Sequence, residues 1–396
     1  MIYLITLFFL VIFIFKYDLT GKIHDAKYNR LYYVIMWWFI CVSGFAYNVG
    51  SDIPIYMKWY DEISLNDYNS ISDLIDHENH QMPGWTLLMI ICKSISKNFL
   101  LPKLVISIFC NCVFFKFIKR HSQYPLITVL FYGLSLYLNM NFNALRQMIA
   151  VSIFLLSYEY LLNKKLLNYY LLVLLAYLFH SSAIVCLVFP ILHLYHITKK
   201  TLFMTAFLVL LIAIIFLVSD FGNIINNILI VGSAYFTGDI AALAEMYLDD
   251  ISGSDLNFFG QINIIISLLI VIIIVSVSYD STNKDNMIYK LTLIYCLFYA
   301  LNFSIGVVFS RLIYYVEFFY ICILPFGIMQ IAKKMFKKSL LIVILLLCFL
   351  AKRPIDNLYR VNPKYDYPLL VQYYPYYSVF NPKIDPLRNN LFGSYD

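Results

Sequence analysis

Long apolar runs follow one another along almost the whole chain, and this succession limits the possible folds more than any other feature. A helix that crosses a bilayer needs about 20 mostly apolar residues, within a range of about 17 to 25. Hydrophobic residues make up 62% of the 396 residues and charged residues only 13%, whereas soluble domains contain about 25% charged residues. The sequence therefore predicts an all-α polytopic integral membrane protein with about 12 transmembrane helices. The predicted spans are 2–16, 31–48, 99–116, 124–141, 143–162, 166–180, 183–197, 201–219, 259–279, 288–308, 311–332 and 339–351.

One further apolar run, residues 83–95, is too short to count among these spans. It has about 13 residues, the length of re-entrant and interfacial segments, and Lys93 interrupts it. If it crossed the membrane, the basic loop that carries Lys119 and Arg120 would change sides. We therefore expect one short re-entrant or interfacial helix at 83–95.

Lysine and arginine are distributed unevenly between the connecting segments, which predicts the orientation of the chain. Basic residues gather in short loops, such as the pair Lys164 and Lys165, and loops of this kind face the cytoplasm. The two long loops have the opposite character. Residues 49–82 carry seven acids and one lysine, and residues 220–258 carry six acids and neither lysine nor arginine. Both long loops are therefore expected to face outward.

The same orientation predicts the domain organisation. Residues 1–351 are expected to form a single transmembrane helical domain with both termini outside. Residues 352–396 are rich in tyrosine and proline and form an outward-facing tail, in which the prolines exclude a long helix.

Several function classes lack support in the sequence. The net charge of +6 is spread over many short loops, which is typical of membrane orientation, so no nucleic-acid partner is expected. The eight cysteines lie in apolar runs without CxxC or Cys/His spacing suited to zinc. Walker A, GxGxxG and Asp-x-Asp motifs are absent from the sequence. We therefore expect neither a metal nor a cofactor.

Four ionisable residues that are costly at membrane depth are predicted to emerge on the outer side. Asp52 follows the second span, Arg146 begins the fifth, His180 ends the sixth and Arg311 begins the eleventh. They come from separate parts of the chain, and the orientation was derived from other charges. Their convergence predicts a site at the outer surface.

Two arginines in such a site suggest anion binding, because the guanidinium group matches phosphate oxygens in bidentate fashion. Arg146 also lies in the first turn of its helix, where unpaired N–H groups attract anions. A diphosphate carried by a membrane lipid fits this arrangement, and either Asp52 or His180 is a candidate general base towards a hydroxyl. Each residue also has a purely structural interpretation: the arginines as interfacial anchors, His180 as a packing residue and Asp52 as a helix cap.

At these residues the sequence resembles the EpsG family of bacterial envelope proteins, which is related to Wzy-type O-antigen and capsular polysaccharide polymerases. Three stretches carry the resemblance, over about residues 30 to 330. They are NVGSDIPIYMKWYDEI, with Gly50, Asp52 and Tyr56; the stretch from FNALRQMIA to FHSSA, with Arg146, Gln147, His180 and Ser182; and FSRLIYYVEFFYICILP, with Arg311 and Tyr315. The sequence departs from the family where Glu-Pro often precedes the short helix, because Met82-Pro83 stands there.

The resemblance implies polymerisation of undecaprenyl-diphosphate-linked oligosaccharide repeats at the outer face of the bacterial inner membrane, in a multi-pass protein. In that reaction a hydroxyl of one lipid-linked repeat attacks the anomeric carbon of the chain on another, and the lipid diphosphate leaves. Expected partners are this substrate, membrane lipid, a flippase and a chain-length regulator. The candidate catalytic residues are Asp52, His180, Arg146 and Arg311, and the candidate substrate-binding residues are Tyr56, Tyr60, Gln147, Tyr315 and Glu317.

Three alternatives remain open from the sequence. A ligase or other membrane glycosyltransferase of similar architecture would pass the glycan to a different acceptor. A polysaccharide flippase or transporter would need a polar path through the bilayer, and no matched pair of broken helices is evident. A membrane O-acyltransferase would make His180 indispensable and leave the arginines optional.

Overall fold

The computed structural model describes residues 2–65, 82–218, 258–279, 286–302, 306–336 and 358–388, apart from positions 22, 24 and 363–365, together with residues 74, 348, 352, 355 and 356. Of the predicted outward loop 49–82, residues 66–81 apart from residue 74 lie outside the described residues. The same holds for residues 220–257 of the predicted outward loop 220–258, and for the predicted span 339–351 apart from Cys348. The described chain packs as two compact units, Met1–Leu187 with Ile344–Asp396 and Val188–Val343. The prediction of a single transmembrane domain stays a prediction.

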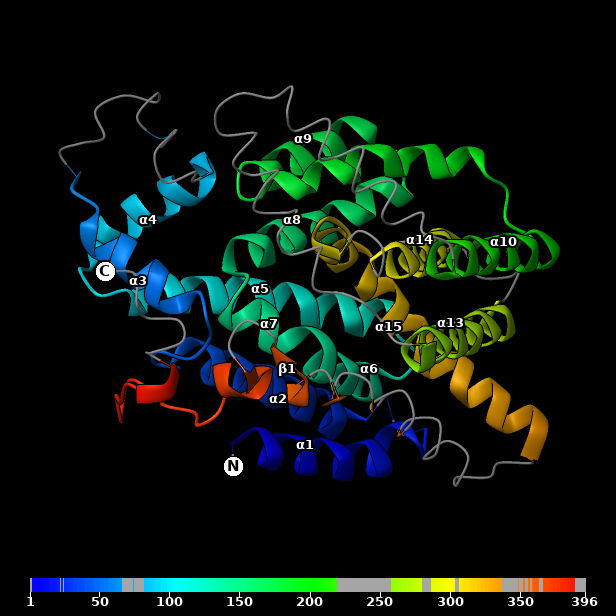
Figure 1. Cartoon of the computed structure of the whole chain (residues 1–396), viewed down its shortest axis with the longest axis horizontal. Helices are drawn as coiled ribbons and strands as arrows, with labels where there is room; N and C mark the ends of the chain where they lie inside the picture. The colour runs from blue at the N-terminus through cyan, green and yellow to red at the C-terminus, as the bar shows by residue number, and fades with distance from the viewer. Residues whose placement is uncertain are drawn as a thin grey trace. The chain divides into compact units, whose positions relative to one another are not determined.

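Helices build the first unit, and their order follows the predicted spans closely (Figure 1). Helix α2 packs along α5, and α8 packs along α9. The short run forms helix α4 over the predicted residues; at about 1.5 Å per residue its 13 residues extend about 20 Å, less than the roughly 30 Å of a hydrocarbon core. The helices are α1 (Ile2–Phe13), α2 (Ala26–Gly44), α3 (Ile53–Glu62), α4 (Pro83–Ile95), α5 (Leu100–His121), α6 (Pro125–Tyr132), α7 (Leu138–Phe142), α8 (Leu145–Leu162) and α9 (Leu166–Tyr177).

Three of the predicted spans depart from a plain α-helix. The span at 2–16 ends in a π-helical stretch, Ile14–Asp18. The span at 124–141 is divided into α6 and α7 by a π-helical stretch, Gly133–Tyr137. The span at 183–197 is a 3-10 helix, Ser181–Leu194, with Pro190 inside. Proline has no N–H to donate and disfavours the α-helical pattern. At about 2.0 Å per residue, the 14 residues of this 3-10 helix extend about 28 Å.

In the second unit, the α-helices that the structure describes are α10 (Lys199–Val218), α13 (Phe258–Ser278), α14 (Asn286–Leu301) and α15 (Gly306–Phe336). Helix α15 packs against α13 and α14, and α10 packs against the same two helices. At Gly327 the backbone of α15 lies very close to α13, because a Cβ there would lie 2.4 Å from the side chain of Ile274.

Four described helical segments are long and apolar enough to cross a membrane: Leu100–His121, Pro125–Phe142, Leu145–Leu162 and Val308–Ala332. Shorter apolar helices accompany them, at Pro83–Ile95, Leu166–Tyr177, Ser181–Leu194, Ile265–Ser278 and Asn286–Leu301. The protein is therefore a helical membrane protein, and the count of about 12 spans stays a prediction.

Aromatic rings and a small polar network fill the core between α2, α5 and α6. Phe39 stacks on Tyr132 with ring centroids 6.0 Å apart and meets Tyr137 edge-on at 4.6 Å. The hydroxyl of Tyr132 donates to Oδ1 of Asn111, whose Nδ2 donates to Asn141. Buried polar groups are costly unless they are hydrogen-bonded, and these pair with one another. Many of the chain's tyrosines and phenylalanines thus serve packing.

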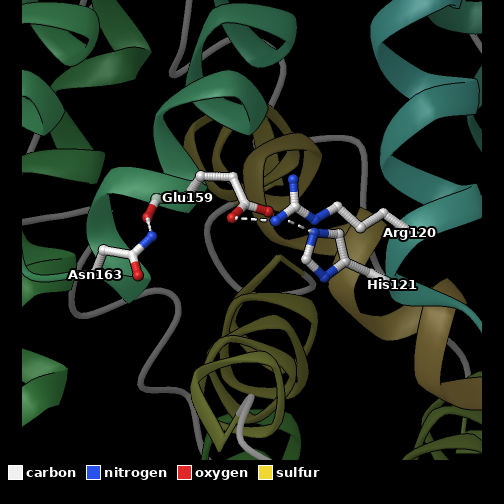
Figure 2. Close-up of polar contacts among 4 residues, drawn as sticks. All are labelled: Arg120, His121, Glu159 and Asn163. Atoms are coloured by element: carbon white, nitrogen blue, oxygen red, sulfur yellow. Dashed lines mark hydrogen bonds and ion pairs between the residues drawn. The ribbon is translucent and has the colours of Figure 1, made fainter.

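A charged cluster joins α5 and α8 near their C-terminal ends (Figure 2). Glu159 accepts from Nη2 of Arg120 at 2.7 Å and lies 3.4 Å from Nε2 of His121, while Asn163 donates to its backbone carbonyl. Glu159 lies 13 residues beyond Arg146 on α8, about 20 Å along the axis. This cluster therefore marks the end of α8 opposite to the candidate site.

The C-terminal segment, residues 366–388, belongs to the first unit and packs on its helices. Its first residues form strand β2 (Tyr367–Pro368), which pairs with β1 (Val361–Asn362) in a short antiparallel hairpin. A 3-10 turn, Leu369–Gln372, follows. Its backbone pairs with the end of α2, where Val379 N–H donates to Phe45 O at 2.9 Å and Tyr47 N–H donates to Tyr377 O at 3.0 Å. The ring of Tyr3, at the start of α1, meets the ring of Tyr376 at 5.9 Å. The start of α1, the end of α2 and the C-terminal segment therefore share one end of the unit.

Candidate functional site

The loop that leads into α3 is tightly constrained. Asn48 and Gly50 both have positive φ, 47° and 107°, a region that glycine adopts freely and other residues seldom do. A Cβ on Gly50 would lie 2.0 Å from the backbone oxygen of Phe142. Only glycine fits this approach, which brings the loop against the end of α7.

Asp52 stands at the N-cap position of α3, but its carboxylate makes no capping hydrogen bond to the helix. Instead, Oγ of Ser51 donates to Oδ1 of Asp52 at 2.8 Å. The N–H of Ser51 donates to Oδ1 of Asn143, also at 2.8 Å. The carboxylate is thus oriented by a neighbour that the α7–α8 junction holds in place, and the capping interpretation loses its basis.

Arg146 lies in the first turn of α8, as predicted, and is half-buried. Its guanidinium carbon lies 5.9 Å from the ring centroid of Tyr56 and 5.8 Å from that of Trp59, both on α3. Cation–π contacts of this kind restrict the planar guanidinium group. Tyr56 in turn packs against Trp85 of α4, with centroids 5.1 Å apart. Trp59 and Trp85 were not predicted as site residues, although the aromatic pair in the stretch KWY was a visible signal.

His180 lies in the turn after α9, and its ring is fixed through Nδ1. The N–H of Ser182 donates to this nitrogen at 3.2 Å, and Oγ of Ser182 lies 2.7 Å from it. Gln147, next to Arg146, donates from Nε2 to the same Oγ at 3.4 Å. A backbone N–H can only donate, so Nδ1 accepts and the neutral imidazole carries its proton on Nε2.

Helix α4 closes onto the same turn. Pro83 takes the first helical position, which suits a residue without N–H, and Gly84 N–H donates to Leu178 O at 2.8 Å. A Cβ on Gly84 would lie 2.8 Å from that oxygen. The chain segment that carries His180 is therefore in backbone contact with the short helix.

Tyr60 has a packing role in the structure. It is buried, and its hydroxyl donates to Ser96 O at 2.6 Å. Burial raises the pKa of Tyr60 to about 12, so the hydroxyl stays protonated as a donor. Lys93 donates to the backbone oxygen of Tyr60 at 2.6 Å. These contacts hold α3 against α4, and contact of Tyr60 with substrate stays a prediction.

Arg311, Tyr315 and Glu317 all lie on α15, in the second unit. Arg311 is exposed, Tyr315 is fully buried and Glu317 is half-buried. Within the first unit, the structure brings the helix of Asp52, Arg146 and the turn of His180 together through Tyr56, Gln147 and Ser182. The convergence of Arg311 with them stays a prediction, as do the roles of all these residues.

Polar residues of the C-terminal segment also reach this site. Nδ2 of Asn143 donates to Oε1 of Gln372 and to the hydroxyl of Tyr373, both at 2.8 Å. Gly50 N–H donates to Gln372 O at 2.8 Å. These partners are more than 200 residues apart in sequence, and no local pattern could have predicted them.

Comparison with known proteins places the chain in a family. The model described as the EpsG family matches residues 29–377. No curated protein and no solved structure matches the chain. The family match includes the Asp52 loop, the start of α8, the His180 turn and α15. Because it covers most of the 396 residues, the chain belongs to the EpsG family, a family of Wzy-type polymerase-like membrane proteins.

Proposed function

We propose that this protein polymerises undecaprenyl-diphosphate-linked oligosaccharide repeat units at the outer face of the bacterial cytoplasmic membrane. The observation that supports this most directly is the joining of three separate segments of the first unit: the Asp52 loop with α3, the start of α8 and the His180 turn. They combine an oriented carboxylate, a restrained guanidinium group and an imidazole donor at one end of the first unit.

Arg146 is assigned to the leaving diphosphate. Its guanidinium group lies at the positive end of α8, beside the rings of Tyr56 and Trp59, which restrict its orientation. A restrained donor aimed at developing negative charge lowers a barrier by about 3 to 4 kcal/mol in comparable sites. Arg311 is proposed as the second cation, contributed by α15, with Tyr315 and Glu317 on the same helix.

Asp52 is assigned as the general base. In the proposed step its carboxylate takes the proton of the acceptor hydroxyl as that oxygen bonds to the anomeric carbon of the donor. The bond from this carbon to the diphosphate oxygen breaks, and lipid diphosphate leaves with the electron pair. The diphosphate link supplies the driving force, so no nucleotide enters the step.

His180 is assigned as a hydrogen-bond donor. With Nδ1 accepting from Ser182, the neutral imidazole offers an N–H at Nε2, which suits a sugar or phosphate oxygen. The same tautomer disfavours the O-acyltransferase alternative, in which this histidine would have to accept a proton. The aromatic residues Tyr56 and Trp59, beside Arg146, are proposed to border the bound sugar.

The proposal is tested first in a strain that lacks the gene. The size distribution of the surface glycan and of the lipid-linked intermediates is measured, and single lipid-linked repeats are expected to accumulate. Full-length polymer retained on its lipid carrier would indicate a ligase. A normal ladder that lacks only acyl groups would indicate an acyltransferase, and either result would overturn the proposal.

Complementation then tests the site. Arg146→Lys and Arg311→Lys keep the charge and lose the planar fork, so both are expected to leave mostly single repeats. Arg120→Lys is the matched control, because Arg120 pairs with Glu159 at the opposite end of α8 (Figure 2) and should restore the ladder. Normal chain lengths with both site variants would overturn the assignment.

A further inference from the structure

Arg388 is a buried cation for which the proposed reaction has no use. Its side chain is 1% exposed, and its guanidinium group donates to three backbone carbonyls. Nη1 donates to Asn48 O, Nε to Val371 O at 3.1 Å and Nη2 to Pro375 O at 2.7 Å. A buried charge is costly unless its hydrogen bonds are satisfied. The three carbonyls offset the cost of burying the guanidinium group, and loss of any of them would leave a buried donor without its acceptor.

Of these three carbonyls, one belongs to the loop that leads to Asp52 and two belong to the C-terminal segment. Arg388 therefore ties the C-terminal segment to a loop 340 residues earlier in sequence. It also lies beyond residue 377, where the family match ends. The family match therefore does not include this contact.

The C-terminal segment holds the Asp52 loop at further points. Gly50 N–H donates to Gln372 O, and Asn143 bridges Ser51 to Gln372 and Tyr373. The loop residues Asn48 and Gly50 adopt positive φ, a conformation that persists when surrounding contacts fix it. In this loop those contacts come largely from residues 372–388.

We propose that the C-terminal segment, residues 366–388, is a positioning element of the site, and that Arg388 is the positioning residue that locks it against the Asn48–Asp52 loop. The guanidinium group fixes Asn48, the backbone of Gln372 fixes Gly50, and the carboxylate of Asp52 takes its place two residues later. The inference rests on the proposed function for its catalytic consequence. Its structural part, ordering of the loop by Arg388, stands apart from that function.

The structural part is tested by hydrogen exchange on the full-length protein in detergent. Arg388→Gln is expected to raise exchange at the amides of Tyr47 and Gly50, which donate to the C-terminal segment. Lys383→Gln is the matched control, since Lys383 is an exposed cation of the same segment, and it should leave these amides protected. Unchanged protection in Arg388→Gln would overturn the inference, whatever the reaction proves to be.

The catalytic part is tested with lipid-linked single repeats extracted from the deletion strain as substrate. Arg388→Gln is expected to lower kcat about 10- to 100-fold with KM changed less than about 3-fold, because misplacement of about 1 Å has effects of this size. Arg388→Lys should rescue little, since one ammonium group cannot span three carbonyls in the fork geometry. A wild-type kcat in Arg388→Gln would overturn the positioning role.

A disulfide distinguishes loss of position from loss of folding. Ala46 and Ser378 are partners in an antiparallel bridge, and such partners have Cα atoms about 4.5 to 5.5 Å apart, within disulfide range. Ala46→Cys with Ser378→Cys, added to Arg388→Gln, should restore kcat when oxidised and lose it again on reduction. Ala46→Cys alone in Arg388→Gln is the control. If the oxidised pair fails to restore kcat, Arg388 has only a folding role.

The two hypotheses fail in different ways. If Asp52→Asn abolishes turnover while Arg388→Gln is normal, only the positioning role is wrong. If Asp52→Asn retains turnover while Arg388→Gln loses loop protection, the assignment of the base is wrong and the ordering of the loop by Arg388 stands.

Discussion

The backbone N–H of Ser182 donates to Nδ1 of His180 over 3.2 Å. This relationship fixes which nitrogen of the ring carries the proton, because a backbone N–H has no lone pair to offer in return. Gln147 supports the same arrangement by donating to Oγ of Ser182 at 3.4 Å. The choice between Asp52 and His180 as the base, open from the sequence, is therefore resolved in our proposal in favour of Asp52.

Two substitutions at His180 separate a donor from a base. His180→Gln places an amide N–H near the position of Nε2, whereas His180→Asn places an acceptor near Nδ1 and offers no donor at the Nε2 position. We expect His180→Gln to retain turnover within about 10-fold and His180→Asn to lose about 100-fold or more, within the range of general acid–base and donor effects. Turnover is measured on lipid-linked repeats. Equal, near-complete loss in both variants would favour a base.

The aromatic residues around Arg146 provide a second test. Trp59→Leu removes a ring whose centroid lies 5.8 Å from the guanidinium carbon, a contact worth about 0.5 to 2 kcal/mol. Turnover is expected to fall about 3- to 30-fold, and Trp59→Phe should fall less because a smaller ring remains. Trp37→Leu on α2 is the control, since Trp37 is 51% exposed on another helix. Similar turnover in Trp59→Leu and wild type would remove the aromatic contact from the mechanism.

The helices were predictable from the sequence because apolar length and local breakers determine them. Residues 83–95 form α4 with the predicted bounds, since Pro83 begins the helix and the apolar run ends near Ile95. The same pattern could not predict the π-helical stretch Gly133–Tyr137 or the 3-10 helix Ser181–Leu194. Hydropathy reports which residues avoid water, and it contains no information on which backbone carbonyl each N–H selects.

The candidate site was predictable only in part, for a related reason. Asp52, Arg146 and His180 stand out because ionisable groups at a membrane boundary are rare and costly. Asn143, Gln372 and Arg388 act through partners up to 340 residues away, and such pairs leave no local trace. Arg388 in particular lies in a proline-rich tail whose composition resembles a surface segment.

Two glycines near the site are expected to tolerate no side chain. Gly50→Ala would place a Cβ 2.0 Å from Phe142 O in a backbone with φ of 107°, and Gly84→Ala would place one 2.8 Å from Leu178 O. Both should lower turnover at least about 10-fold, because each displaces a backbone segment of the site. Gly133→Ala is the control, since its Cβ would make only ordinary contacts at 3.5 Å with Phe39. A fully active Gly50→Ala protein would contradict the loop conformation.

Asp18 gives a prediction about stability and pH at the opposite end of the unit. It follows the predicted span 2–16, is 1% exposed, and Oδ2 accepts from Ile127 N–H at 3.0 Å. Burial raises the pKa of Asp18 to about 7, against the lowering effect of its hydrogen bonds to Ile127 and Leu126. The folded state therefore holds the proton more tightly than the unfolded state.

The sign of the pH effect follows from this difference. Between about pH 4 and pH 7 the folded protein binds more protons at Asp18, so the free energy of unfolding falls as the pH rises through this window. Asp18→Asn keeps an acceptor for Ile127 and cannot ionise. At pH 8 it is expected to raise the free energy of unfolding by up to about 4 kcal/mol, which is measured in detergent as a higher thermal midpoint. At pH 4 it is expected to change the midpoint little. Asp356→Asn is the control, because Asp356 is exposed beside Lys352. If Asp18→Asn lowers the midpoint at pH 8, the ionised carboxylate stabilises the fold, and burial is not the dominant effect on this group.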